Sequence, residues 1–151
     1  RAGVGGYQGY AGIEPDLSIF GKVVGGGLPV GAIGGKSKMM DVVDTTKETG
    51  SPTVNQSGSF SGNNLTLAAG LATLKALTPE AYSHLDNITN QLHVGMEEVF
   101  NQANIPCQVV SVGSMLNPFI SEVPIRDYRA FANIDSGLTN RIHLGLLLKN
   151  T

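Results

Sequence analysis

The stretch DLSIFGKVVGGGLPVGA, residues 16–32, decides the fold that we expect for this chain. Its residues 17–20 are a short, mostly apolar run, which predicts a buried strand. Lys22 follows that strand after a single glycine, and we expect the two valines after the lysine to remain extended. Three glycines and a proline then interrupt the chain before a second short strand, predicted over residues 30–33. The stretch therefore places a lysine at the end of a buried strand, beside a glycine-rich turn.

Gly21 and Lys22 form the dipeptide found in phosphate-binding loops, but the rest of that motif is missing. The motif is G-x-x-x-x-G-K-[ST], and its final hydroxyl holds magnesium. Here Val23 follows the lysine, and Asp16 stands where the first glycine is required. The dinucleotide-binding pattern G-x-G-x-x-G does not occur in the sequence either. Neither nucleotide-binding motif explains the lysine.

Lys22 has two possible roles when only its neighbouring residues are considered. A neutral amine is the form that attacks an aldehyde, and burial without a counter-charge favours the neutral form. A lysine at the end of a buried strand is therefore suited to forming a Schiff base. An ordinary lysine, whose aliphatic stem lies along apolar surface while its amine stays in water, fits the same position. Periodicity alone favours the ordinary lysine.

Outside residues 16–32, capping residues and apolar spacing predict the other elements. A helix is expected over residues 64–77, with leucines every three or four residues on one face and small residues on another. Thr78, Pro79 and Glu80 then predict the start of a long helix, and this junction is also the predicted domain boundary. The apolar stripe of that helix comprises Ala81, Leu85, Ile88, Leu92, Met96 and Val99, and the helix should end near Asn104. The remaining predictions are a loop over 1–13, a helix over 37–43 with Ser37 as N-cap, a loop over 44–58, strands over 108–112 and 115–120 joined at Gly113, and helices over 124–132 and 136–149.

Composition excludes several classes of protein. The chain has 151 residues, of which 41% are apolar and 15% charged, and its net charge is −2. The apolar content is sufficient for a core, and the low charge argues against disorder and against nucleic-acid binding. No apolar run approaches the roughly 18 residues of a membrane span. The low charge also indicates that other protein surface covers much of this chain.

Cysteine and histidine usage argues against disulfides and metals. Cys107 is the only cysteine, and the three histidines lack the spacing of metal ligands. We expect Cys107 to be buried rather than nucleophilic, and we expect a reducing compartment, with the cytoplasm as the default. Arg1 opens the chain without an initiator methionine, so we interpret the sequence as an internal segment of a longer protein.

Residues 16–32 closely resemble the cofactor-lysine segment of the class III aminotransferases, which are fold-type I enzymes that use pyridoxal 5′-phosphate. A second match is GSFSGN at residues 58–63, followed by LTLAAGLA at residues 65–72. These are similar to the family's G-T-[FL]-S-G-N-P and A-A-G stretches. Within the class, both segments look most like the glutamate-1-semialdehyde 2,1-aminomutases and their close aminotransferase relatives. The motifs cover residues 1–77, and beyond Thr78 the resemblance is one of pattern.

The resemblance implies an α/β fold in two parts. Residues 1–77 would be the C-terminal part of the large domain that binds pyridoxal phosphate. Residues 78–151 would begin the small C-terminal α+β domain. The family's aspartate that pairs with the pyridine nitrogen would precede Arg1, outside this chain.

The resemblance also implies roles for three residues. Lys22 would be the catalytic residue, forming the internal aldimine with the cofactor and then carrying protons. Gly58 and Ser59 would bind the cofactor phosphate of the neighbouring subunit, in a homodimer with shared active sites. Ser59 stands where the family usually has threonine, and Asn64 replaces its usual proline. A turn serine or a helix cap is the alternative interpretation of Ser59.

The expected function is amino-group transfer on a small amino acid or amino aldehyde, as an aminotransferase or an aminomutase. Two alternatives remain open. A decarboxylase or racemase on the same scaffold would keep Lys22 and cleave a different substrate bond. A catalytically inert relative would have a structural or binding role instead.

Overall fold

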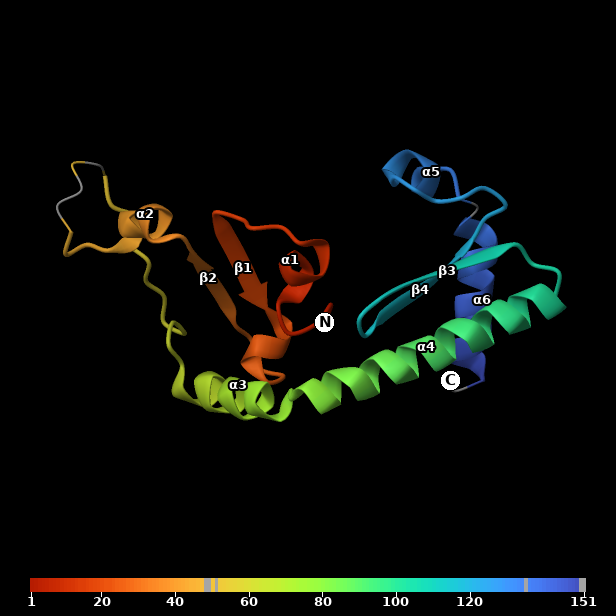
Figure 1. The fold of residues 1–151 in the computed structure, drawn as a ribbon, viewed down its shortest axis with the longest axis horizontal. Helices are drawn as coiled ribbons and strands as arrows, with labels where there is room; N and C mark the ends of the chain where they lie inside the picture. The colour runs from red at the N-terminus through yellow and green to blue at the C-terminus, as the bar shows by residue number, and fades with distance from the viewer. Residues whose placement is uncertain (48–49, 51, 135, 150–151) are drawn as a thin grey trace. The chain divides into compact units, whose positions relative to one another are not determined.

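Two antiparallel strands carry the lysine segment in the computed structural model, which describes residues 1–47, 50, 52–134 and 136–149. They are β1 (Leu17–Gly21) and β2 (Gly31–Gly35), paired with Ile19 opposite Ile33. Both lie close to the predicted positions (Figure 1). The connection begins with the short 3₁₀ turn η1 (Lys22–Gly25), so the prediction that the two valines after Lys22 are extended is wrong. Left-handed backbone at both ends of this turn, at Lys22 and at Gly26, bends the chain there instead.

The predicted burial of the first strand is wrong for the described chain. Ile19 is 83% exposed and Phe20 is 42% exposed. The reason is that β1 and β2 form a sheet of only two strands in the part of the chain that the structure describes. Apolar side chains of β1 consequently have few neighbours.

Helix α3 (Asn64–Ala76) packs on η1 through its small residues. Thr66 and Gly70 are buried at this contact, whereas Ala68 and Ala72 are exposed. Leu67 and Leu71 are 55% and 56% exposed, so the predicted apolar face remains uncovered in the described chain. The contact therefore depends on small residues rather than on leucines.

Two further elements of this half of the chain differ from prediction. The glycine-rich start contains a short helix, α1 (Gly6–Ala11), where a loop was expected; Gly12, with a φ of +65°, ends it. The predicted helix over 37–43 is present as α2 (Ser37–Met40) followed by the 3₁₀ turn η2 (Asp41–Val43). Its N-cap is Lys36 and not Ser37, because Ser37 already has helical backbone. The predicted loop over 44–58 contains no helix or strand in its described residues, while 48, 49 and 51 lie outside them.

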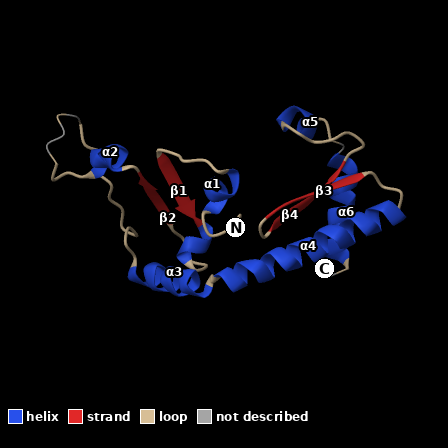
Figure 2. Cartoon of the chain, viewed as in Figure 1, coloured by secondary structure: helices blue, strands red, loops and turns tan. Residues whose placement is uncertain are grey.

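A long helix and a hairpin dominate the rest of the chain (Figure 2). Helix α4 (Pro79–Gln102) begins where predicted, and the hydroxyl of Thr78 accepts a hydrogen bond of 3.3 Å from the Ala81 N–H. Strands β3 (Cys107–Val112) and β4 (Met115–Ile120) form the predicted antiparallel hairpin. The short helix α5 (Tyr128–Ala132) occupies only part of the range predicted for it, and α6 (Ser136–Leu148) matches its prediction closely.

The buried face of α4 differs from the predicted stripe. Thr89 is buried in place of the predicted Ile88, and its hydroxyl donates to the Leu85 carbonyl at 2.9 Å. His93 is hydrogen-bonded to Ser111 of β3 at 3.0 Å, whereas the predicted Leu92 is 51% exposed. His93 therefore has a polar partner on the hairpin, whereas the partner of Thr89 lies within α4.

Residue contacts divide the chain into one unit of Gly3–Tyr82 and a second of Ser83–Thr151 with Arg1–Ala2. Among the described apolar side chains, Val109 and Ile120 are the buried ones, so the core is smaller than the composition predicts. None of the described helices has both the length and the apolar character needed to cross a membrane.

Candidate cofactor site

Lys22 has an unusual backbone conformation. Its φ is +56°, and Asn104 is the other described non-glycine residue with positive φ. The left-handed region costs an L-residue roughly 1–2 kcal/mol, so such a residue persists only where its surroundings hold it there. The side chain of Lys22 is exposed in this chain, and the expected burial of the lysine is wrong here.

The turn around Lys22 is held by backbone contacts on both sides. Before it, Gly21 is paired with Gly31 in the two-stranded sheet. After it, the Gly26 N–H donates to the Val23 carbonyl at 3.0 Å. The conformation of Lys22 is therefore set between a strand end and a closed turn.

The second matched motif forms a compact loop, residues 57–63, which we call the serine loop. The Ser61 N–H donates to the Gly58 carbonyl at 2.9 Å, and the Asn63 N–H donates to the Phe60 carbonyl at 3.2 Å. The side-chain oxygen of Asn63 accepts from the Thr66 N–H at 3.1 Å and caps α3. The loop is thus attached to the first turn of α3.

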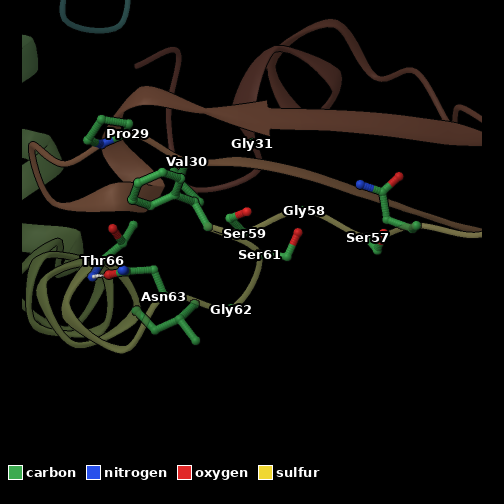
Figure 3. A pocket seen from close by; sticks show the side chains of 13 residues that line it. Pro29, Val30, Gly31, Ser57, Gly58, Ser59, Ser61, Gly62, Asn63 and Thr66 are labelled. Carbon is green, nitrogen blue, oxygen red and sulfur yellow. Dashed lines mark hydrogen bonds between the residues drawn. The ribbon is translucent and has the colours of Figure 1, made fainter.

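The serine loop borders a cavity of about 400 Å³ between itself, the start of β2 and the start of α3. Gly58, Ser59 and Ser61 line it, together with Val30 and Thr66. Figure 3 shows Ser59 and Ser61 along one stretch of the loop, with Asn63 and Thr66 at the helix start. Within the described residues, no hydrogen bond occupies the Ser59 hydroxyl, so this group is available to a ligand.

The donors in this cavity suit an anion. Serine hydroxyls and loop N–H groups donate hydrogen bonds, and the start of α3 adds the positive end of a helix dipole. The residues lining the cavity include no aspartate or glutamate. A Cβ on Gly58 would lie 3.2 Å from the Ser61 hydroxyl oxygen, so glycine leaves room for that hydroxyl. A phosphate group fits this donor set.

The structure brings together two of the three predicted site residues. Gly58 and Ser59 line the same cavity, whereas Lys22 does not line it. The three belong to one unit, because η1 and α3 pack together and α3 carries the serine loop.

Sequence reasoning assigned no role to five polar residues that line the cavity: Gln56, Ser57, Ser61, Asn63 and Thr66. Ser61 belongs to the matched motif, but its hydroxyl was not assigned a role. Asn63 and Thr66 stand three apart at the start of a helix, the spacing of an N-cap and the N–H that it accepts. That spacing would have identified the cap, and with it the geometry of the loop.

Among the described residues, the titratable groups outside the serine loop form no second candidate site. Cys107 is half-buried rather than buried as expected. This partial burial raises the pKa of its thiol, which disfavours the reactive thiolate. Among the residues that the structure describes, no group of three or more histidine, cysteine or acidic side chains is arranged to hold a metal ion.

Comparison with known proteins gives consistent matches. The family model for aminotransferase class-III matches residues 3–139. Glutamate-1-semialdehyde 2,1-aminomutase 1 of Staphylococcus epidermidis is 39% identical over 143 residues, which are 95% of this chain and 32% of that protein. The chain therefore spans about a third of the length of this curated relative.

Solved structures agree with the sequence matches. An omega-transaminase from Sphaerobacter thermophilus aligns with a TM-score of 0.79 and 40% identity, over 85% of this chain and 29% of that one. A transaminase solved with PLP bound aligns with a TM-score of 0.74 and 29% identity, over 82% of this chain and 28% of its own.

Proposed function

This chain belongs to the class-III aminotransferase family, and from that premise we propose that it is part of a pyridoxal 5′-phosphate-dependent enzyme that transfers amino groups. One observation carries the proposal. The two segments that resemble the family, residues 16–32 and 58–72, fold against each other through η1 and α3. This packing places the lysine turn and a loop with donors suited to an anion in one unit.

Lys22 is the residue proposed to attach the cofactor. Its amine would bind the cofactor aldehyde covalently, and after release Nζ would accept and return the substrate proton. The bound cofactor supplies an electron-withdrawing ring that weakens bonds at the substrate carbon bearing the amino group. The protein's own part is to orient that carbon toward Lys22 and to move the proton.

Gly58 and Ser59 are proposed to hold the cofactor phosphate. The Ser59 hydroxyl would donate one hydrogen bond, and backbone N–H groups of the serine loop would add others. The N–H groups of Ser61 and Asn63 are excluded from this set, because they already donate within the loop. The family resemblance of residues 58–63 implies that this phosphate belongs to the cofactor of the neighbouring subunit. We therefore propose a homodimer in which each active site takes Lys22 from one subunit and Ser59 from the other.

Apolar side chains of α3 leave surface that further protein must cover, and the proposed dimer is one source of it. Leu67, Leu71 and Leu74 lie on one face of α3 and are each about half exposed in the described chain.

We further assign residues 1–77 to the large cofactor domain and residues 78–151 to the start of the small domain. The single cysteine supports a cytoplasmic location.

An aminomutase moves the amino group between adjacent carbons of one molecule, whereas a transaminase passes it to a second, keto-acid substrate. The similarity to glutamate-1-semialdehyde 2,1-aminomutases favours a small amino aldehyde as substrate, and the similarity to transaminases favours an amino donor with a keto acid.

Product analysis of the full-length protein with added cofactor tests this function. Conversion of an amino aldehyde into its isomer, with no second substrate present, would identify an aminomutase. A new amino acid formed from a keto acid would identify a transaminase. Release of carbon dioxide or loss of chirality would identify the decarboxylase or racemase alternative. Absence of any cofactor absorbance change on mixing would contradict the enzyme assignment and leave the inert relative.

A further inference from the structure

Two glycines let η1 and α3 meet backbone to backbone. A Cβ added to Gly70 would overlap the Val24 carbonyl oxygen. A Cβ added to Gly26 would overlap the Ala69 carbonyl and lie 2.8 Å from the Gly70 backbone nitrogen. We call this approach of residues 24–26 to residues 69–70 the glycine contact. Because the neighbouring atoms are backbone, a side chain at either position can be accommodated only by moving the turn or the helix.

The glycine contact lies two to four residues after Lys22. On its other side, Lys22 follows Gly21, whose partner in the sheet is Gly31. Lys22 is therefore held between two fixed points, and between them its φ is +56°. A left-handed lysine needs surroundings that enforce the conformation, and the glycine contact supplies one of them.

We propose that Gly26 and Gly70 are positioning residues that hold the Lys22 backbone in its left-handed conformation and so direct its amine toward the cofactor aldehyde. The proposal rests on the proposed role of Lys22. It also assigns a function to the A-A-G part of the second motif. The glycine of that part is Gly70, the residue of α3 that contacts the turn after Lys22. Both motifs then contribute residues to the contact that positions Lys22.

Gly70→Ala is the variant that tests the proposal. Alanine is the better helix former, so helix propensity alone would favour the substitution. Any loss must then come from the contact with Val24. Gly95→Ala in α4 is the matched control, since it is the same change inside a helix and a Cβ there has open space within 4 Å.

Comparing the affinities for two forms of the cofactor distinguishes a misplaced Lys22 from a general disruption of the cofactor site. Pyridoxal 5′-phosphate has the aldehyde that Lys22 binds, whereas pyridoxamine 5′-phosphate has an amine and binds only through non-covalent contacts. In the full-length protein, Gly70→Ala should weaken binding of the aldehyde form by about 10- to 100-fold, the order expected for a displacement near 1 Å. Affinity for the amine form should stay unchanged, and Gly95→Ala should change neither. Equal weakening of both forms would overturn the proposal.

Amide hydrogen exchange in the apoprotein measures the local stability of the turn after Lys22 in the absence of the cofactor. Gly70→Ala should speed exchange in the peptide that covers residues 22–28, where the Gly26 and Leu28 N–H groups are hydrogen-bonded. Unchanged exchange there, with unchanged affinity for the aldehyde form, would contradict the proposal. If Gly70→Ala does not fold, Gly25→Ala serves for the exchange measurement alone, because its Cβ would lie 2.7 Å from a Val30 side-chain carbon and Val30 also lines the cavity of the serine loop. Failure of the wild-type protein to attach pyridoxal 5′-phosphate at Lys22 would instead contradict the proposed function, and the exchange result would still report on the contact.

Discussion

Lys22 combines an unfavourable backbone with a reactive side chain. Its left-handed φ is a conformation that glycine adopts without steric cost. Lysine at this position is therefore best explained by the need for its amine rather than by stability. The strain is consistent with the way functional residues retain conformations that cost free energy.

Replacing Lys22 by glycine or by alanine should separate these two properties. Lys22→Gly should unfold at a higher urea concentration than Lys22→Ala, with a difference of about 0.5–1 kcal/mol after glycine's greater flexibility is subtracted. Both variants should lose covalent cofactor attachment. Urea titration of the full-length apoproteins measures the difference. Equal stability of the two variants would argue that the turn relaxes out of its left-handed conformation.

Ser59 is the residue whose replacement tests the phosphate site. A hydroxyl that donates to a phosphate makes a charge-assisted hydrogen bond, typically worth about 1.5–3 kcal/mol. Ser59→Ala should weaken cofactor affinity by roughly 10- to 150-fold, because about 1.4 kcal/mol corresponds to one decade. Ser59→Thr keeps the hydroxyl and should be nearly neutral. Fluorescence titration of the apoprotein gives both affinities, and an unaffected Ser59→Ala variant would remove Ser59 from the site.

At the scale of elements, helix α3 connects the two parts of the candidate site. Its first turn is capped by Asn63 of the serine loop, and its middle is in contact with η1. The order of both segments therefore depends on one helix of 13 residues.

Removal of the cap should affect the serine loop more than the lysine turn. Asn63→Ala leaves the Thr66 N–H without its acceptor and should cost about 1 kcal/mol in unfolding free energy. Affinity for inorganic phosphate, measured by competition with the cofactor, should fall as well. Asn64→Ala, one residue later and inside the helix, is the control and should change neither quantity appreciably.

Elements with local signals were predictable from the sequence. The start of α4 was predicted correctly because Thr78 and Pro79 act within one helical turn. The hairpin was predicted from two apolar runs around Gly113, whose φ of +53° suits glycine. Such signals depend on neighbouring residues and need no knowledge of the packing.

Burial and contact faces were not predictable in the same way. β1 was expected to be buried, but exposure depends on what packs on the sheet, and Ile19 has little against it in the described chain. Thr89 is buried on α4, and its hydroxyl donates within that helix, to the Leu85 carbonyl. The half-buried His93 has a polar partner on the hairpin, Ser111. For the site, motif resemblance identified Lys22 and Ser59, whereas the left-handed backbone of Lys22 has no signature in residue type.

At the scale of the whole molecule, the chain is about a third of its curated relatives in length. Half-exposed leucines on α3, at positions 67, 71 and 74, show how much apolar surface this part of the fold leaves uncovered. Burial of such surface is favourable at roughly 25 cal/mol per Å². The proposed dimer would use this gain.

Sedimentation of the full-length protein at micromolar concentration should accordingly show at least a dimer.

Complementation between two inactive variants then tests whether the active sites are shared between subunits. A mixed dimer of Lys22→Ala and Ser59→Ala subunits would contain one doubly damaged site and one intact site, so activity should rise well above that of either parent. A stable, active monomer would contradict the dimer. Absence of recovery after confirmed subunit exchange would contradict phosphate binding across the interface.

The most direct test of the central claim is borohydride reduction of the full-length protein with pyridoxal 5′-phosphate bound, followed by peptide mapping. Reduction makes the bond between cofactor and lysine permanent, so the labelled residue can be identified by mass spectrometry. The account predicts a pyridoxyl group on the peptide that contains Lys22, and its loss in Lys22→Ala. A label on Lys36 or Lys38 instead, or bound cofactor that leaves Lys22 unmodified, would contradict it.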